Sequence, residues 1–335
     1  MSCQRRYVWH DPAMGMAGVF RPLVKSSKRQ KLDVEMHWKR ASFHWRGPDQ
    51  LGIGDQSVLF AVLEAAGEHL HESPSDARAD ATDTLWDLLG HQKHVFRNDT
   101  LLVTASFSRL ARLCGWSDGG SSLKRVMDSL RRLTETTVWV RQVNEDGEAF
   151  EGSSRLLAWR LGDRKSVALI VNWRLAQALH GAHYSRISLD ERACLHTEVA
   201  RALHALLSCR VSPGKAWSCS LEKLQVHVWG DALTGAGLRT RRVRLRRALE
   251  AIGAMRGWGI TFDADVVRIG RGRIASTANV ASTLRVRPVA TVTPRLIENE
   301  SPSLPKQPLG EKSNADSDLQ NFDVSALFST RERHA

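Results

Sequence analysis

The spacing of hydrophobic residues predicts a long helix between Leu238 and Met255. Its apolar positions are separated by seven, four, three and three residues, so they form one stripe of an α-helix. Six arginines fall between Arg239 and Arg247, in the first half of this stretch. A helix of this kind packs its apolar stripe on a core and presents cations to an anionic partner.

Further periodic stretches surround this arginine-rich helix (238–256). A long helical pattern begins at Ser188 and ends near Val211, and a short one over 220–230 closes with Trp-Gly. Alternating runs at 258–262 and 266–269, with a turn between them, predict a β-hairpin after the arginine-rich helix.

The first half of the chain has a similar order of patterns. A short helix is predicted over 106–116, where Gly115 stops it, and a second helix over 122–133. Strand-like runs follow at 138–143, with a hairpin turn signal at 145–147, and then at 155–161 and 166–171.

Each half therefore contains a Leu-x-x-Leu helix that ends at a tryptophan, Trp116 or Trp229, then a basic helix, then a hairpin. Helix, helix and hairpin is the order of a winged helix-turn-helix. The sequence thus predicts an α+β, mainly helical fold with tandem winged helix-turn-helix domains and a disordered C-terminal tail.

The composition along the chain predicts four regions. Residues 1–47 form a basic, tryptophan-containing N-terminal arm, 48–180 a first winged-helix domain and 186–275 a second. Residues 286–335 are polar, interrupted by prolines and mildly acidic, which is typical of disorder. A small apolar island at 320–328 resembles a docking motif loosely, and ordinary tail sequence is the favoured interpretation.

The net charge of +12 is concentrated in two segments. Residues 1–47 hold ten Lys/Arg against three Asp/Glu, and 238–256 hold seven Arg against one Glu. Such clustering is typical of phosphate binding and favours DNA as the partner. A solvated face and a membrane-surface helix are the alternatives, and both are weaker because only Glu250 lies nearby to pair and no large aromatics mark the apolar stripe.

The cations of these segments are the candidate DNA contacts. Arg241 and Arg242 are expected on bases or phosphates, because the arginine fork can address guanine O6 and N7 together. The end of the hairpin after the arginine-rich helix is expected to contact the flanking DNA backbone or minor groove. The basic helix of the first domain is expected to make equivalent DNA contacts. The candidate set is Arg239, Arg241, Arg242, Arg244, Arg246, Arg247, Arg271, Arg273, Lys124, Arg125, Lys28, Arg29 and Lys31.

No catalytic residue, metal site or cofactor is predicted. The sequence contains no P-loop, and its five cysteines form no CxxC pair, so reduced thiols in a cytoplasmic protein are expected. The apolar runs are too short for a membrane span. His69-Leu-His71 matches part of the metal motif of nicking enzymes, but it ends an amphipathic helix, and only Tyr7 and Tyr184 are present as nucleophiles. We therefore expect a protein that is not an enzyme.

Three stretches of the chain also carry a family resemblance. They are His10–Arg21 leading into Lys31–Val34; Arg186–Glu191 with Thr197–His204; and Pro213–Lys215, Val228–Trp229, Thr240–Arg244, Ala248–Leu249 and Gly257–Trp258. Together they resemble the RepC-type replication initiator of IncQ broad-host-range plasmids. The likeness covers 8–275 and is most specific over 190–260, whereas the loop at 70–95 and the tail depart from it.

The resemblance implies tandem winged helices that bind short direct repeats, called iterons, at a plasmid origin. It also implies opening of an adjacent AT-rich region and recruitment of a helicase and a primase. Whether a monomer or a homodimer binds the repeats stays open. A winged-helix repressor of its own promoter is the alternative, and a nicking enzyme is a third, weaker hypothesis.

Overall fold

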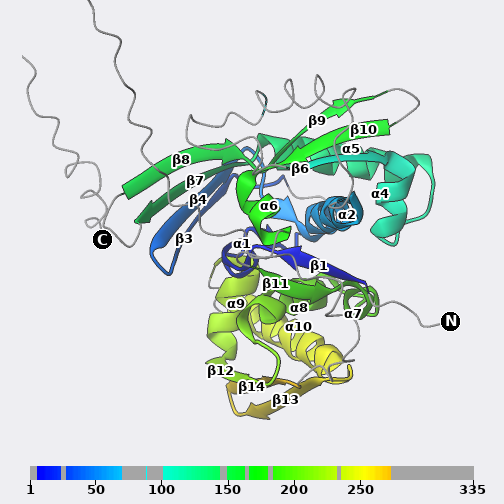
Figure 1. Cartoon of the computed structure of the whole chain (residues 1–335). Helices are drawn as coiled ribbons and strands as arrows, with labels where there is room; N and C mark the ends of the chain where they lie inside the picture. The colour runs from blue at the N-terminus through cyan, green and yellow to red at the C-terminus, as the bar shows by residue number, and fades with distance from the viewer. Residues whose placement is uncertain are drawn as a thin grey trace, which may run out of the picture. The chain divides into compact units, whose positions relative to one another are not determined.

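Small sheets, antiparallel except for one parallel pair of strands, and the helices packed on them form a mixed α+β fold in the described part of the chain (Figure 1). The computed structural model describes residues 6–23, 28–69, 88, 101–143, 149–162, 166–179, 184–231 and 235–272. All of them belong to one unit, Met1–Ser276. The predicted tail at 286–335 lies outside the described residues.

The second half of the unit contains a strand, two helices and a hairpin, which we call module 2. The three strands form one antiparallel sheet in the order β12-β14-β13. The elements of module 2 are β12 (Ala216–Ser220), α9 (Leu221–Trp229), α10 (Gly235–Gly253), β13 (Trp258–Asp263) and β14 (Val266–Arg271).

Local chemistry sets the bounds of these helices. The Ser220 hydroxyl caps α9 by accepting from the amide of Lys223. Gly230 ends α9 with a φ of 80°, in the left-handed region that favours glycine. The arginine-rich helix was expected to begin at Leu238, but α10 already begins at Gly235, because the glycines predicted to form the preceding turn are helical.

The helix predicted over 188–211 is instead two helices, α7 (Leu189–Ala193) and α8 (Glu198–Arg210). Ser188 caps the first and Thr197 caps the second, each by accepting a backbone amide bond. Because each capping residue marks the N-terminus of a helix, two of them nine positions apart favour two separate helices. The prediction of a single helix is therefore wrong.

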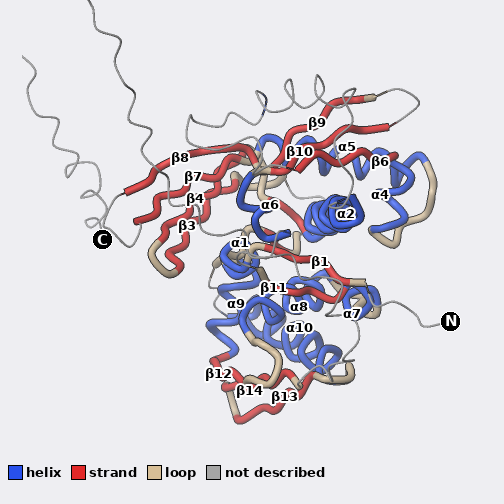
Figure 2. Tube along the Cα trace, viewed as in Figure 1, coloured by secondary structure: helices blue, strands red, loops and turns tan. Residues whose placement is uncertain are grey.

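Module 1 is the corresponding arrangement in the first half of the unit, and Figure 2 shows the same alternation of strand and helix there. Its strands pair in the order β6-β10-β9, which matches the order in module 2. The elements are β6 (Leu101–Ser106), α4 (Phe107–Leu113), α5 (Gly120–Glu135), β9 (Leu157–Leu161) and β10 (Ser166–Val171).

The strand predicted at 138–143 belongs to a different sheet. β7 (Thr137–Val143) pairs with β8 (Ala149–Arg155) and with β4 (Ala41–Gly47), and β4 in turn pairs with β3 (Leu32–Trp38). The hairpin of module 1 is therefore β9–β10, not the pair that starts at β7. The turn predicted at 145–147 lies outside the described residues.

The N-terminal segment is part of the fold rather than an arm that extends from it. β1 (Tyr7–His10) pairs with β11 (Ser185–Ser188), and β2 (Phe20–Arg21) pairs with β5 (Leu51–Gly52). Between them, α1 (Pro12–Met16) packs on α8, and a Cβ at its Gly15 would collide with the Sγ of Cys209. The contacts of β1 and α1 join sequence positions nearly 200 residues apart, so more of the segment predicted to be an arm packs on the body than its tryptophans alone indicated.

Helix α2 (Ile53–His69) lies at the centre of the unit. It contacts α4, α5 and β6 of module 1, and it also contacts β1 and α8. Almost every position from Ile53 to Ala66 is buried, because neighbours cover the helix on all sides. A last helix, α6 (Trp173–Leu179), follows module 1 and contacts α2. In the described residues, no helix is long and apolar enough to cross a membrane.

Candidate nucleic-acid interface

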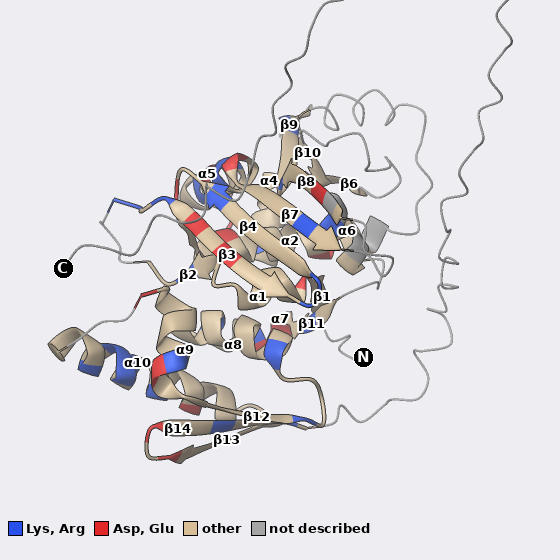
Figure 3. Cartoon of the chain, turned by 90° about the vertical axis from the view of Figure 1, so that its left-hand side faces the viewer, with Lys and Arg blue, Asp and Glu red and all other residues tan. Residues whose placement is uncertain are grey.

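The outer face of α10 is the most cationic surface that the described residues present. Leu245, Ala248, Leu249 and Ile252 bury the inner face of the helix. The opposite positions are exposed and carry three arginines, Thr240, Val243 and, further along, Glu250. Figure 3 shows the Lys and Arg positions of the helix as blue bands. We call the following exposed residues the α10 outer face: Arg239, Thr240, Val243, Arg244 and Arg247.

Arg241 lies at the edge of the buried stripe and is held within module 2. Its guanidinium contacts both carboxylate oxygens of Asp231, at 2.9 and 3.4 Å, and donates to the Asp231 carbonyl at 3.2 Å. Its Cζ also lies 5.1 Å from the centre of the Trp229 ring. Only 18% of the Arg241 side chain is exposed, so this residue links α10 to the end of α9.

Two further arginines of α10 hold the β13–β14 turn. Arg242 pairs with Asp265 at 3.5 Å. Arg246 donates to the Ala264 carbonyl at 2.7 Å and covers the Phe262 ring at 5.0 Å. The positive φ of Ala264, 48°, belongs to the tight turn that these contacts hold in place.

The remaining arginines of the predicted set are Arg239, Arg244 and Arg247. In the described part of the chain, none of the three has an ion pair or a hydrogen-bonded side-chain partner. Val243, 49% exposed, lies between them on the same face. The structure thus separates six arginines that look alike in sequence into three structural ones and three that are free to contact a ligand.

In module 1, the predicted cations lie on α5 and are mostly paired. Arg125 covers the Trp116 ring, with Cζ 3.9 Å from the ring centre. Lys124 and Arg131 both contact the carboxylate of Asp128, at 3.4 and 4.0 Å. The exposed side of α5 therefore carries less unpaired positive charge than the α10 outer face.

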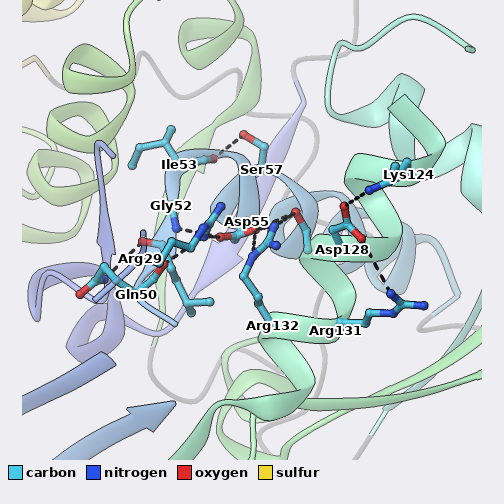
Figure 4. A network of polar contacts seen from close by, with 12 residues as sticks. Arg29, Gln50, Gly52, Ile53, Asp55, Ser57, Lys124, Asp128, Arg131 and Arg132 are labelled. Atoms are coloured by element: carbon cyan, nitrogen blue, oxygen red, sulfur yellow. Dashed lines mark hydrogen bonds and ion pairs between the residues drawn. The ribbon is translucent and has the colours of Figure 1, made fainter. Parts of the chain in front are cut away.

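Arg29 takes part in a buried ion-pair network rather than in a surface cluster (Figure 4). Asp55, only 1% exposed, accepts from Arg29 at 2.8 Å, from Arg132 at 2.7 and 3.1 Å, and from the Ser129 hydroxyl at 2.7 Å. The amide of Gly52 donates to the same carboxylate. Burial acts to raise the pKa of Asp55, but the bonds and charge of Arg132 outweigh it and leave the pKa below its ordinary value.

The structure also locates the other cations of the predicted set. Lys28 and Lys31 are exposed before β3, next to residues 24–27, which lie outside the description. Arg271, expected to hold DNA backbone, is 8% exposed and donates to the carbonyls of Ser208, Val211 and Arg186. That expectation is wrong, because a guanidinium engaged beneath the surface cannot reach a phosphate. Arg273 lies outside the described residues.

Sequence reasoning missed a buried polar cluster around Glu191. The carboxylate of Glu191 accepts from His204 at 2.9 Å and from the Trp258 indole at 3.0 Å, which joins α7, α8 and β13. Burial lowers the pKa of His204, although its bond to Glu191 opposes that shift. The three residues had been singled out only through the family resemblance, and their spacing of 13 and 54 positions gives no local signal.

Arg192, the residue after Glu191, connects α7 to α8 and to the central helix α2. It is buried, donates to the Arg201 carbonyl at 2.8 Å and lies over the Phe60 ring of α2. Burial lowers the pKa of Arg192 to about 9. Its role is to attach the α7–α8 corner to the central helix. Among the described residues, no group of three His, Cys, Asp or Glu side chains is arranged to hold a metal ion.

Comparisons with known proteins add a family to this geometry. Crystal structures of domains 2 and 3 of RctB are similar in outline, with TM-scores of 0.46 and 0.44 at 13% and 15% sequence identity. They match 78% of this chain and 98% and 96% of the RctB chains. No curated protein has a matching sequence. The model of the family Replication protein C (RepC) matches residues 3–273, and the chain therefore belongs to the RepC family of replication proteins.

Proposed function

We propose that this protein initiates plasmid replication by binding direct repeats of duplex DNA, the iterons, through the α10 outer face. The observation that carries the proposal is the set of three unpaired arginines on one exposed side of α10. Membership of a replication protein family makes origin DNA the natural anionic partner.

In this proposal module 2 acts as a winged helix-turn-helix. α9 and α10 are the helix pair, and the β13–β14 hairpin is the wing. The face of α10 opposite Leu245 and Leu249 enters the major groove. Arg242 and Arg246 fix the wing against the helix, so the reading surface is rigid before DNA arrives.

The chemistry of the α10 outer face suits base reading as well as phosphate contact. Arg244 and Arg247 are placed to donate to guanine O6 and N7 or to phosphates. Val243 offers an apolar group of the kind that contacts the thymine methyl. Thr240 beside them has a hydroxyl that serves either base or backbone.

Module 1 supplies the second, weaker DNA contact through Lys124 and Arg125 of α5. Opening of an AT-rich region and recruitment of a helicase and a primase are part of the same proposal, supported by the resemblance to RepC-type initiators. The protein acts here by binding, with no chemical step assigned to it.

Fluorescence anisotropy tests the assignment with a duplex that carries the direct repeats found beside the gene. We expect the double variant Arg244→Ala/Arg247→Ala to bind roughly 10- to 100-fold more weakly, and the salt slope of binding to fall by about one per lost phosphate contact. Arg46→Ala/Arg141→Ala removes two exposed arginines of β4 and β7, outside both modules, and as the matched control it should bind as wild type does.

Unchanged affinity of the double variant would refute the α10 assignment. Footprinting on the same DNA separates the proposed initiator from a repressor. An initiator protects an array of repeats next to an AT-rich tract, whereas a repressor of its own promoter protects a single operator.

A further inference from the structure

Four planar side chains form a row on the outer face of the two-stranded β1–β11 sheet. Tyr7 and Trp9 come from β1, Arg186 from β11, and Tyr184 immediately precedes β11. Trp9 and Arg186 are register partners. The row contains both tyrosines of the chain.

The row consists of two stacked pairs, Arg186 on Tyr7 and Trp9 on Tyr184, which the pairing of Trp9 with Arg186 places side by side. The Cζ of Arg186 lies 3.6 Å from the centre of the Tyr7 ring. The rings of Trp9 and Tyr184 are 4.8 Å apart at 17°, so they are nearly parallel. Alternate positions of the same strands, Val8 and Ile187, are buried, which leaves the row on the solvent side.

The row ends at a ring that is open to solvent. Tyr184 is 46% exposed while Trp9 covers one side of it. Arg186 is also exposed, and in the described residues it has no carboxylate partner. A stack of flat groups with one free aromatic end and one unpaired cation is complementary to an unpaired base and its phosphate.

We propose that the row Tyr7–Arg186–Trp9–Tyr184 is a binding site for single-stranded DNA. A base of the unpaired strand extends the stack on Tyr184, and Arg186 contacts its phosphate. The site is separate from the α10 outer face, which has no aromatic side chain and suits a duplex groove. The inference goes beyond duplex recognition, and it rests on the proposed function for the source of the strand, an opened origin.

Binding of labelled (dT)20 and of the labelled duplex repeat by the full chain tests the site. We expect Tyr184→Ala to weaken (dT)20 binding about tenfold, because the loss of one base–aromatic stack has an effect of that order. Tyr184→Phe should bind (dT)20 as wild type does, because it keeps the ring. Neither variant should change affinity for the duplex.

The double variant Arg244→Ala/Arg247→Ala should show the opposite pattern, with duplex binding weakened roughly 10- to 100-fold and (dT)20 binding kept. If that variant binds the duplex as wild type does, while Tyr184→Ala still weakens (dT)20 binding, the α10 assignment is refuted and the single-strand site is still supported. The site is overturned if Tyr184→Ala binds (dT)20 as tightly as wild type does. It is also overturned if Tyr184→Ala loses duplex and single-strand binding together, because the row would then support the fold. A change in the molecular mass in solution alone would overturn it too, because the row would then form an interface between two copies of the chain.

Discussion

In module 1 the second helix, α5, carries four cations and two acids, whereas in module 2 the second helix, α10, carries six arginines and one glutamate. The strand order is the same in both modules. In each, a serine caps the first helix and a left-handed glycine, Gly115 or Gly230, follows it. Each also places an arginine of the second helix over the tryptophan near the end of the first.

The modules differ in where their arginines find partners. In module 1, Arg132 reaches the buried Asp55 and Asp128 neutralises its neighbours along α5. In module 2, the acidic partners Asp231 and Asp265 lie in turns on either side of α10. With its acidic partners in the turns, the outer face of α10 carries three unpaired arginines against one acid, Glu250. One topology can therefore support a helix that is tied into the core and another that is free for a ligand.

The largest expected effect is loss of the anion that ties α5 into the core. Asp55→Ala leaves two partly buried guanidinium groups unpaired, and we expect it to cost about 3–5 kcal/mol of unfolding free energy. Urea denaturation measures this. Asp128→Ala removes an exposed pair on the same helix and should cost at most about 0.5 kcal/mol. Equal losses of unfolding free energy in the two variants would mean that the buried ion pairs of Asp55 stabilise the fold no more than the surface pairs of Asp128 do.

The second expected effect concerns the N-terminal segment that packs against both halves. Burial lowers the pKa of His10 to about 4. In the unfolded chain the ring takes up a proton near pH 6.5, so the unfolded state binds more protons between these values. The contribution of His10 to the unfolding free energy is therefore fully present above pH 6.5 and is lost as the pH falls, with a loss of about 2 kcal/mol at pH 5.

A His10→Leu variant tests this dependence. Neither ring nitrogen of His10 has a hydrogen-bond partner in the described structure, so an apolar residue of similar size removes no bond. Unfolding free energies at pH 7 and pH 5 should differ less in the variant than in wild type. The residual slope comes from His204 and His227, whose pKa values burial also lowers. Identical slopes would exclude His10 as the titrating group.

The two left-handed glycines provide a matched pair of intermediate effect. Gly115→Ala meets open space and should cost about 1 kcal/mol from its positive φ alone. Gly230→Ala has the same backbone strain, and its Cβ would also collide with the guanidinium of Arg21. We expect its thermal midpoint to drop by clearly more than that of Gly115→Ala. Equal drops would mean that Arg21 moves away at little cost.

The last comparison exchanges the charge pattern of the two helices, and its effects are expected in DNA affinity rather than in stability. Asp128 and Val243 each lie two positions before a buried leucine, Leu130 or Leu245, that two arginines follow. Val243→Asp places an acid on the α10 outer face and should weaken repeat binding about tenfold, or about 1.4 kcal/mol. Asp128→Val should strengthen binding to nonspecific duplex a few-fold by releasing Lys124 and Arg131. Fluorescence anisotropy measures both affinities. If neither variant changed its DNA affinity, the charge patterns of α5 and α10 would not account for a difference in DNA contact between the modules.

The local elements were predictable because they depend on near neighbours. Stop glycines and apolar spacing located both helix pairs, and alternation located the hairpin of module 2. The strand at 138–143 was also located, but its partner was not. Alternation identifies a strand, yet it contains no information on whether β4, some 95 residues earlier, or a neighbour along the chain pairs with it.

The sequence by itself determined that this chain has two helix-pair modules, a basic helix in each, and a concentration of arginine in the second. Only the tertiary structure decided which arginines remain free, because Asp231, Asp265 and Asp55 come from turns and a distant helix. It also decided that the N-terminal segment is part of the core. Charge and periodicity are properties of a segment, whereas pairing depends on which segments meet in space.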